Sequence, residues 1–488
     1  MSKYLVLMFI LLSPSTVFSE DLGPMRLSLI QGNVQILTQD NDDWAPAEIN
    51  MPLTEGDRLW VAEESRLEIQ VEGGVYVRAD ERTALDILSA GSDAMQLYVN
   101  EGHLFINNRY GGIRTVQVDT PQSSIRSYDD SIMLLDVQED GTTEVQALKG
   151  YVHAENKEGK TMIGPGDALT IRPDGTAELA PIGTPDEWER WNMDRDRQLV
   201  AWGESSRYLP DALHEYSADL DQYGRWVYVS EYGYVWNPGV TALDWVPYRE
   251  GYWQWVRGRY VWISHEPWGW APYHYGRWAY VTGTGWCWVP PAANEIYWAP
   301  GYVGWVNTPE YVGWVPLAPG EIYYSYGYYG PRSVNITTGN VNTIAAPHYR
   351  NVPVRNSVTV VRRDTFGTRE RVLVRPAENP FAAHRDRFLP PASRPEPRPS
   401  VQQPIIRIPD VKRPPDRIQR TAPAEIKSQR KLERQPEASV FRPASPKPLP
   451  TRQVKEPKVV VRGTKGTERT GTERKGEIKR DQQQKRER

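Results

Sequence analysis

Three stretches of the sequence share one pattern: GRWVYVSEYGYVWNP from Gly224 to Pro238, GRYVWISHEPWGWAP from Gly258 to Pro272, and GRWAYVTGTGWCWVP from Gly276 to Pro290. Each copy of 15 residues opens with Gly-Arg, places Trp or Tyr third and fifth, and ends with Trp thirteenth and Pro fifteenth. Internal repeats indicate one structural unit used several times. We predict that each copy is a β-hairpin, with strands at positions two to six and eleven to fourteen.

Side chains alternate between the two faces of a strand, so each copy has an aromatic face and an opposite face of Val, Ile or Ala. Two interpretations of the aromatic face remain open. The rings can pack between neighbouring hairpins as a core, or some of them can line an open groove where sugar rings or a peptide stack. The candidate packing or ligand-stacking positions are Trp226, Tyr228, Trp236, Tyr260, Trp262, Trp270, Trp278, Tyr280 and Trp288.

Residues 1–19 predict export. Lys3 is followed by an apolar run from Tyr4 to Leu12 and then by Ser19, which is the pattern of a secretory signal peptide with cleavage after Ser19. This apolar run is far shorter than the roughly 20 residues that span a bilayer, so we expect no transmembrane span after signal cleavage. The expected location is periplasmic or secreted. Cys287 is the only cysteine, and no internal disulfide can form.

Residues 20–182 alternate short apolar runs with Gly, Asp and Asn, which predicts an all-β sandwich, barrel or short solenoid. In the run LEIQV, Leu67 and Ile69 lie on one face, and Glu68 and Gln70 lie on the other. We therefore expect a half-buried strand with one side in water.

Glycine-containing corners recur through this region at Gly32-Asn33, Gly56-Asp57, Gly150-Tyr151 and Gly166-Asp167. In this order they resemble the FecR-type periplasmic domain. The resemblance implies an extracytoplasmic, non-catalytic module, which in the regulator of ferric-citrate uptake relays a signal from an outer-membrane receptor to a sigma factor. That regulator carries a cytoplasmic anti-sigma segment and a membrane span before this domain, whereas this chain has a cleavable signal.

A linker helix is predicted over residues 184–207. Thr184 and Glu187 have the spacing of a capping box, in which the two side chains satisfy free backbone N–H groups. Trp188 and Trp191 begin one apolar stripe along the helix. This stripe either docks on a neighbouring domain or binds a partner.

The Trp-rich β-repeat domain covers residues 208–320 and resembles a tryptophan-rich repeat family of unknown function from bacterial envelope proteins. The resemblance rests on YGRW from Tyr223, YGYVW from Tyr232, EPWGWAPYHY from Glu266 and GWVPL from Gly313. The family occurs behind FecR-type domains and has no assigned activity. The resemblance therefore implies a domain organisation and leaves the chemistry open.

The C-terminal third is basic. Residues 321–374 form a Tyr/Gly-rich and polar extension, and residues 375–488 predict a disordered tail rich in Pro, Arg and Lys. From residue 341 onward, 35 Lys and Arg face 16 Asp and Glu, while the preceding part has a net charge of −23. An exported tail is not expected to meet nucleic acid. Its candidate partners are an anionic envelope surface, cell-wall polymers or the chain's own acidic body, and the alternative is a solvated spacer.

No catalytic motif or cofactor site is recognisable in the sequence. The segment His265-Glu266-Pro267 lacks the second His of a zinc protease, and His274 with Cys287 supply only two metal ligands. Glu266 and Asp244 form a glycosidase pair only if the fold brings them together. We expect no cofactor and no metal.

The sequence thus predicts a mainly β protein: a FecR-like β domain, a helical linker, Trp-rich hairpin repeats and a disordered tail. The leading functional prediction is a non-catalytic, exported cell-envelope protein that binds or scaffolds a cell-wall glycan or an envelope protein. The alternatives are a FecR-like signal-relay component and an uncharacterised glycan-active enzyme.

Overall fold

The computed structural model describes residues 25–39, 41–91, 93–108, 115–128, 130–201, 203–240, 244–336, 348–368, 373–374 and 413–419. All of these residues belong to one compact unit, which ends at Gln435. The predicted signal peptide lies outside the described residues, and so does the tail apart from residues 413–419.

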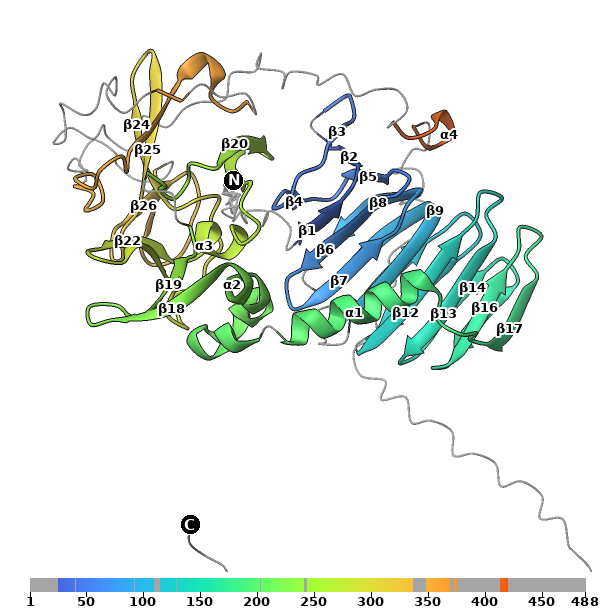
Figure 1. The fold of residues 1–488 in the computed structure, drawn as a ribbon. Helices are drawn as coiled ribbons and strands as arrows, with labels where there is room; N and C mark the ends of the chain where they lie inside the picture. The colour runs from blue at the N-terminus through green and yellow to red at the C-terminus, as the bar shows by residue number, and fades with distance from the viewer. Residues whose placement is uncertain are drawn as a thin grey trace, which may run out of the picture. The chain divides into compact units, whose positions relative to one another are not determined.

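The N-terminal domain consists of two β layers (Figure 1). The first layer, in hydrogen-bonded order, contains β4 (Pro52–Leu53), β1 (Met25–Gln31), β6 (Arg66–Val71), β7 (Val75–Ala79), β9 (Ala94–Asn108), β12 (Ser131–Val137), β13 (Thr143–Lys149), β16 (Asp167–Ile171) and β17 (Ala177–Pro181). The second contains β3 (Ala45–Pro46), β2 (Val34–Leu37), β5 (Arg58–Val61), β8 (Thr83–Ala90), β9 again, β10 (Thr115–Asp119), β11 (Ser124–Tyr128), β14 (Val152–Asn156) and β15 (Gly159–Ile163).

Strand β9 belongs to both layers because it is 15 residues long. Its first half pairs with β8 and β10, and its second half pairs with β7 and β12. One continuous apolar core lies between the layers, and residues such as Leu67 and Ile69 of β6 reach it together with Leu59 of β5. The predicted all-β class of this domain is confirmed.

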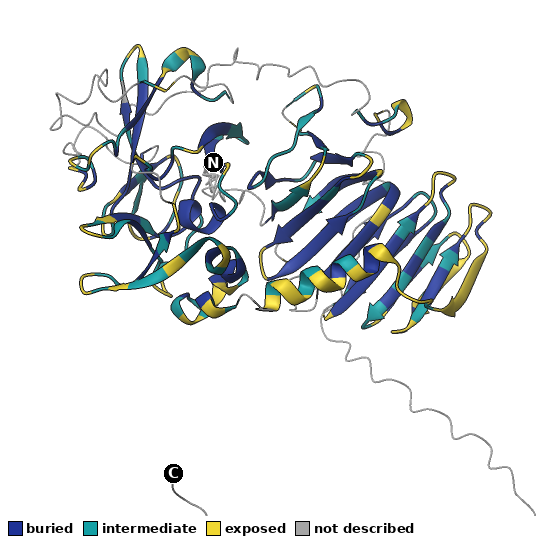
Figure 2. Ribbon diagram, viewed as in Figure 1, coloured by how far each residue is buried: buried dark blue, intermediate teal, exposed yellow. Residues whose placement is uncertain are grey.

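The outer face of β6 differs from the prediction of a side in water. Glu68 is 0% exposed and Gln70 is 3% exposed. The cover is helix α1 (Glu187–Ala201), whose Arg195 donates to Glu68, and the short helix η2 (Asp211–Tyr216), whose Glu215 carbonyl oxygen accepts from Gln70. The short helices η1 (Glu204–Tyr208) and α2 (Ser217–Tyr223) come before and after η2 in the chain. Figure 2 shows α1 with exposed residues along its outer side and buried strands beneath it.

Helix α1 begins at a capping box two residues later than predicted. The Asp186 N–H donates to Glu189 Oε2 at 2.9 Å, and the Glu189 N–H donates to Asp186 Oδ1 at 2.7 Å. The predicted pair of Thr184 and Glu187 was wrong, because Asp186 is itself a strong N-cap and Glu189 reaches back to its amide. Glu187 points into solvent, with 87% of its side chain exposed.

The first turn of α1 docks through aromatic packing, as the apolar stripe predicts. Trp188 is buried and stacks on Trp191, with ring centroids 5.2 Å apart. Both rings pack against Phe105 of β9 and Leu134 of β12. The helix therefore packs against the neighbouring N-terminal domain at this end, as the docking interpretation expects.

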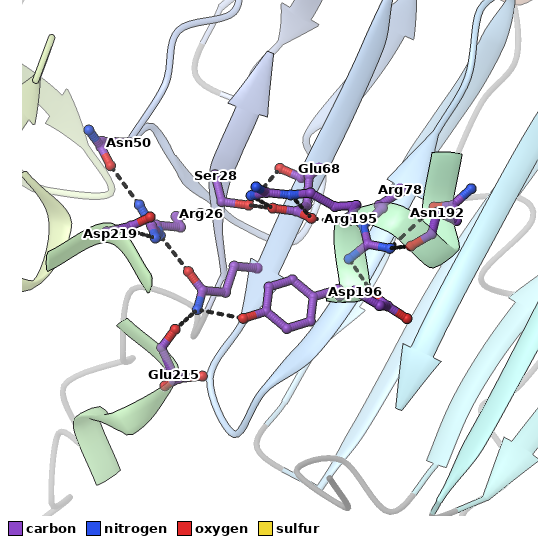
Figure 3. Close-up of polar contacts among 12 residues, drawn as sticks. Arg26, Ser28, Asn50, Glu68, Arg78, Asn192, Arg195, Asp196, Glu215 and Asp219 are labelled. Carbon is purple, nitrogen blue, oxygen red and sulfur yellow. Dashed lines mark hydrogen bonds and ion pairs between the residues drawn. The ribbon is translucent and has the colours of Figure 1, made fainter. Parts of the chain in front are cut away.

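The next two turns of α1 dock through buried charge (Figure 3). Arg78 is fully buried and donates to Glu68 Oε2 at 2.7 Å and to Asp196 Oδ1 at 2.6 Å. Arg195 donates to both carboxylate oxygens of Glu68, at 3.1 and 2.8 Å. Burial alone would raise the pKa of Glu68, but the two guanidinium groups outweigh it and hold that pKa at about 2.

The substitution Glu68→Ala leaves the buried charge of Arg78 without its main partner. We expect the free energy of unfolding to fall by about 3–5 kcal/mol, the usual result of removing one member of a buried ion pair. Urea unfolding at pH 7, followed by circular dichroism, measures the change. The control is Glu63→Ala, because Glu63 pairs with Arg82 on the surface with both side chains about two-thirds exposed. A loss no larger than that of the control would contradict a stabilising role for Glu68.

The Trp-rich domain contains four hairpins in the described residues. They are β18 (Gly224–Val229) with β19 (Gly233–Pro238), β20 (Gly251–Val256) with β21 (Arg259–Ser264), β22 (Arg277–Val281) with β23 (Gly285–Val289), and β24 (Val303–Asn307) with β25 (Tyr311–Pro316). Between β25 and residue 374, the described residues also contain β26 (Tyr323–Ser325), β27 (Ser333–Asn335), β28 (Thr359–Arg362) and η4 (Arg363–Thr365).

Each hairpin has a Trp pair directly across its two strands: Trp226 with Trp236, Trp253 with Trp262, Trp278 with Trp288, and Trp305 with Trp314. The second members of these pairs follow one another at intervals of 26 residues, and all four are fully buried. The structural repeat is therefore a hairpin with a period of 26 residues.

The hairpin prediction is confirmed for the first and third sequence copies and is wrong for the second. Strand β21 pairs with the preceding strand β20 across a tight turn in which Arg257 and Gly258 have positive φ values of 43° and 82°. Positive φ at both central residues is typical of the type I′ turn that joins two-residue hairpins. The segment after β21 contains Pro267 and Pro272, which cannot donate to a strand ladder, and it forms helix α3 (Trp270–His274) instead.

Hairpin β20–β21 has two buried faces. Trp253 and Trp262 lie in the aromatic core of the Trp-rich domain. On the opposite face Tyr252, Val261 and Ile263 belong to the apolar core of the N-terminal domain. This assignment of Trp262 to one face and of Val261 and Ile263 to the other agrees with the predicted strand alternation. The hairpin thus takes part in both cores.

The prediction of a disordered tail does not hold for residues 413–419. They include the short helix α4 (Asp416–Gln419), and Ile418 is 1% exposed in a cluster with Trp44 and Trp60 of the N-terminal domain. Ile418 is a single aliphatic residue between Arg417 and Arg420, yet its side chain packs on an apolar surface of the same chain. The overall composition of the tail does not predict such a contact.

Candidate functional site

Six of the nine candidate aromatic residues lie in the core. They are at most 8% exposed: Trp236, Tyr260, Trp262, Trp270, Trp278 and Trp288. Trp226 is half-buried, whereas Tyr228 is 65% and Tyr280 is 50% exposed. A ring without exposed surface cannot stack on a ligand unless the core opens. Among the nine candidates, the rings of Tyr228 and Tyr280, and part of the Trp226 ring, therefore have exposed surface on which a ligand can stack.

Hydrogen bonds fix several of the buried indoles in place. The indole N–H of Trp236 donates to the carbonyl oxygen of Leu220 at 2.9 Å, and the indole N–H of Trp288 donates to the carbonyl oxygen of Tyr275 at 2.8 Å. The glycine that opens the first copy permits this packing, because a Cβ atom on Gly224 would lie 2.3 Å from the Trp236 ring. These repeated positions record packing constraints.

A groove of about 1260 Å³ lies beside hairpins β18–β19 and β22–β23. We call it the Tyr280 groove, and its lining includes Arg225, Asn237, Asp244, Trp245, Tyr280 and Trp286. The described lining comes from separate stretches of the chain, namely 222–225, 237–240, 244–246, 280–286 and 353–356. Of the nine candidate aromatics, Tyr280 belongs to the described lining.

The aromatic wall of the groove is held rigidly. Tyr280 and Trp286 face each other across the two strands in an edge-to-face arrangement, with ring centroids 5.6 Å apart. The Asn237 amide donates to the carbonyl oxygen of Trp286 at 2.9 Å, and the Trp245 indole donates to Glu266 Oε1 at 2.8 Å. A ligand would therefore meet a preformed surface.

Polar groups of both signs accompany the aromatic wall. Arg225 and Asp244 both have exposed side chains on the groove lining. An aromatic face beside hydrogen-bonding groups suits a ligand with both apolar and polar surfaces, such as a sugar chain or an extended peptide. Tyr228 occupies the equivalent position in the first copy, but it lies outside the described lining and packs edge-on against Tyr234 at 5.4 Å.

Glu266 and Asp244 do not form a matched pair of groove carboxylates. The described lining includes Asp244 and not Glu266. Both oxygens of Glu266 accept hydrogen bonds, one from the Trp245 indole and one from the Tyr273 hydroxyl. Burial raises the pKa of Glu266 to about 7 in spite of these bonds. Its contacts are those of a buried structural carboxyl.

His274 and Cys287 make separate contacts. His274 Nδ1 lies 2.8 Å from the carbonyl oxygen of Ala299, and burial lowers the pKa of this histidine to about 4. Cys287 contacts Asn237, and burial raises the pKa of its thiol to about 11. Among the described residues, no group of three or more His, Cys, Asp or Glu side chains is arranged to hold a metal ion.

Of the polar groove residues, the sequence singled out Asp244 as a candidate carboxylate but did not single out Asn237 or Arg225. Asn237 stands at position fourteen of the first copy, where the other two copies carry Ala271 and Val289. This departure from the repeat could have marked Asn237 as a candidate functional residue. Nothing in the sequence marks Arg225 in this way, because all three copies carry Arg at position two.

The raised pKa of Glu266 predicts a pH dependence of stability. A carboxyl whose pKa is higher in the folded state contributes stability that is complete below its ordinary pKa of 4.5 and is lost as pH rises through about 7. The free energy of unfolding should therefore decrease between pH 5 and pH 8.5, and Glu266→Gln should make this decrease smaller. Glu215 has its pKa raised by burial to about 7 as well, so the variant should keep part of the slope.

Urea unfolding at pH 5, 7 and 8.5 tests this expectation, with Glu158→Gln as the control, because Glu158 is exposed and is not among the groups that shift the pKa of Glu266. The control should keep the full slope of the wild type. A Glu266→Gln variant with that same full slope would contradict the assignment.

Comparison with known proteins divides the chain in the same way as the fold does. Residues 57–153 match the family described as FecR protein, and residues 217–321 match a family of unknown function, DUF6600. The chain therefore carries a FecR-type domain followed by a Trp-rich region to which no function is assigned. No helix in the described part of the chain is long and apolar enough for a membrane crossing.

Two crystal structures of a protein proposed to be an anti-sigma factor, from Parabacteroides distasonis, are also similar to this chain. In each case the sequence identity is 18% and the TM-score is 0.23, and the match covers 25% of this chain. This chain spans 59% of the length of that protein. No curated protein matches the chain.

Proposed function

We propose that this protein is a non-catalytic, exported component of the cell envelope that binds a cell-wall glycan in the Tyr280 groove. The observation that carries the proposal is a half-exposed tyrosine on a fixed aromatic wall, next to the exposed side chains of Arg225 and Asp244. Sugar rings stack their C–H faces on such rings and use their hydroxyls with the polar groups beside them.

The size of the groove favours a chain-like ligand. Pockets for single small molecules usually measure about 300–1,000 Å³. The Tyr280 groove is larger, at about 1260 Å³, and polar groups lie along it. An extended polymer of the cell wall fits these dimensions better than a compact metabolite. Export through the predicted signal peptide would bring the groove to such a polymer.

The substitution Tyr280→Ala should weaken binding to purified cell-wall fragments by on the order of tenfold, because removing an aromatic anchor from an interface typically costs more than about 1 kcal/mol. Tyr228→Ala is a closely matched control. Tyr228 is also an exposed tyrosine at the fifth position of its copy, yet it lies outside the described groove lining. Co-sedimentation with insoluble wall material measures both affinities.

The control should change the affinity by less than about twofold, as an interface-remote surface change does. Equal losses of affinity for Tyr280→Ala and Tyr228→Ala would show that exposed tyrosines contribute only nonspecific binding. Unchanged binding by Tyr280→Ala would reject the groove as the site. Turnover of labelled wall fragments by the wild type would favour the glycan-active enzyme instead.

A second candidate function is signal relay in the envelope, and the FecR family match supports it. A relay needs a mechanical connection between the ligand groove and the FecR-type domain. Hairpin β20–β21 joins the aromatic core to the core of the FecR-type domain, since its side chains belong to both. Trp245 of the groove lining is tied to the residues just after this hairpin, because its indole N–H donates to Glu266. Polar contacts add to it: Arg26 pairs with Asp219 of α2, and the Asn50 amide donates to the carbonyl oxygens of Ser264 and Glu266.

If the groove is coupled to the FecR-type domain, wall fragments should change the hydrogen exchange of amides in β1 and β6. These strands carry Arg26 and Glu68 at the junction. Hydrogen exchange with mass spectrometry measures the change, and Tyr280→Ala should abolish it at the same fragment concentration. Binding that leaves the exchange of β1 and β6 unaltered would oppose the relay and leave the binding proposal standing.

A further inference from the structure

A small apolar surface on the N-terminal domain is covered by the chain's own tail. Trp44, Trp60 and Ala84 form it, and Ile418 packs on them, leaving all four residues less than a tenth exposed. We call this surface, together with its acidic rim, the tail seat. The cover comes from a segment far along the sequence, since the 38 residues from 375 to 412 separate it from Val374.

The rim of the tail seat is acidic, and each arginine of the segment meets it. Arg417 forms a two-pronged contact with Glu101, from Nε and Nη2 to the two carboxylate oxygens at 3.0 and 2.9 Å. Arg413 Nη2 lies 3.2 Å from Asp43 Oδ2. Arginine and carboxylate match in planar geometry, which makes the first contact directional as well as attractive.

The seat also recognises the backbone of the segment. The buried Arg58 is held by Asp86, with Nε and Oδ1 3.0 Å apart, and its Nη2 donates to the carbonyl oxygen of Ile418 at 2.6 Å. A side chain on one domain that is fixed by a neighbour and aimed at a peptide carbonyl is a typical feature of a peptide-binding site. Within the segment, the side-chain amide of Gln419 donates to the carbonyl oxygen of Pro414 at 2.7 Å.

From these contacts we propose that the tail seat is a binding site for peptides that place an arginine directly before an aliphatic residue, and that residues 413–419 of the same chain occupy it in cis. This inference is independent of the glycan groove, since no residue is shared between the two. It assigns a specific docking point to a tail whose predicted partners included the chain's own acidic body.

Because residues 413–419 belong to the same chain as the tail seat, their covalent link to it increases how strongly they occupy it. A covalent connection converts binding into an intramolecular step, with an effective concentration that reaches the order of millimolar. A free peptide of the same sequence must compete with that concentration. It should therefore bind the wild-type chain weakly and bind a chain with an empty seat well.

The test titrates a fluorescent peptide VKRPPDRIQR, covering residues 411–420, into the full chain and into its Ile418→Asp variant. The variant should bind the peptide at least on the order of tenfold more tightly, because its own segment no longer fills the seat. The matched control is Ile426→Asp, the same change at another isoleucine of the tail. It should bind the peptide as weakly as the wild type.

Two further measurements identify the site. Adding Glu101→Gln to the Ile418→Asp chain should remove most of the gained affinity, and a peptide with Arg417→Glu should not bind that chain. Equal affinity of the peptide for the wild type and for Ile418→Asp would overturn the proposal. A wild-type mass that doubles with concentration, and that Ile418→Asp returns to monomer, would overturn occupancy in cis in favour of a second copy.

Discussion

Hairpin β20–β21 leaves neither face to water, and this constraint joins the two domains. A two-stranded hairpin alone is at most marginally stable, so it must bury at least one face. Here Trp253 and Trp262 on one side enter the aromatic core, while Val261 and Ile263 on the other side enter the core of the β layers. Because adjacent side chains along one strand serve different cores, the hairpin cannot slip by one residue without exchanging an indole for a β-branched side chain in both. The register of the strand and the junction of the domains are therefore fixed together.

The second connection joins helix α1 to the first β layer through buried charged side chains. These side chains need more hydrogen-bonding partners than apolar side chains do. Removing Glu68 and Arg78 from water carries a large desolvation cost, which attraction offsets only when the geometry is good and the remaining donors are satisfied. Arg195 and Asp196 on α1 satisfy them, with hydrogen bonds of 2.6–3.1 Å. The helix is consequently held at one position on the sheet, and α2 follows it with Asp219 against Arg26. Apolar packing alone, as between Trp188 and Phe105, would specify this position less sharply.

Features governed by local periodicity could be predicted from the sequence. The strand alternation of Leu67 and Ile69, and the opposite faces of Trp262 and Val261, follow from a period of two. The strand pairing of the second copy could not be predicted, because β21 pairs with the residues before it and not with those after it. Nor could the burial of Glu68, since a charged residue on a strand indicates solvent until a distant helix supplies Arg195. The groove depends on residues that are far apart in the sequence, and of the nine predicted aromatic residues only Tyr280 belongs to its described lining.

A comparison of Tyr228 with Tyr280 distinguishes what the repeat itself determines about a side chain from what the neighbouring residues determine. Both stand two residues after the first Trp of a hairpin, and both are at least half exposed. The equivalent position in β20 is Trp255, which packs edge-on against Tyr260 with centroids 5.0 Å apart. One repeat position is therefore a packed ring in β20, an exposed ring outside the described groove lining in β18, and a groove wall in β22. Three of the four hairpins carry an aromatic ring at this position, and the fourth carries Asn307. Where a ring is present, its neighbours decide its role: Asn237, Asp244 and residues 353–356 stand beside Tyr280 in the groove lining. Binding specificity in such an array arises where the copies differ, because identical positions satisfy the common requirement of packing.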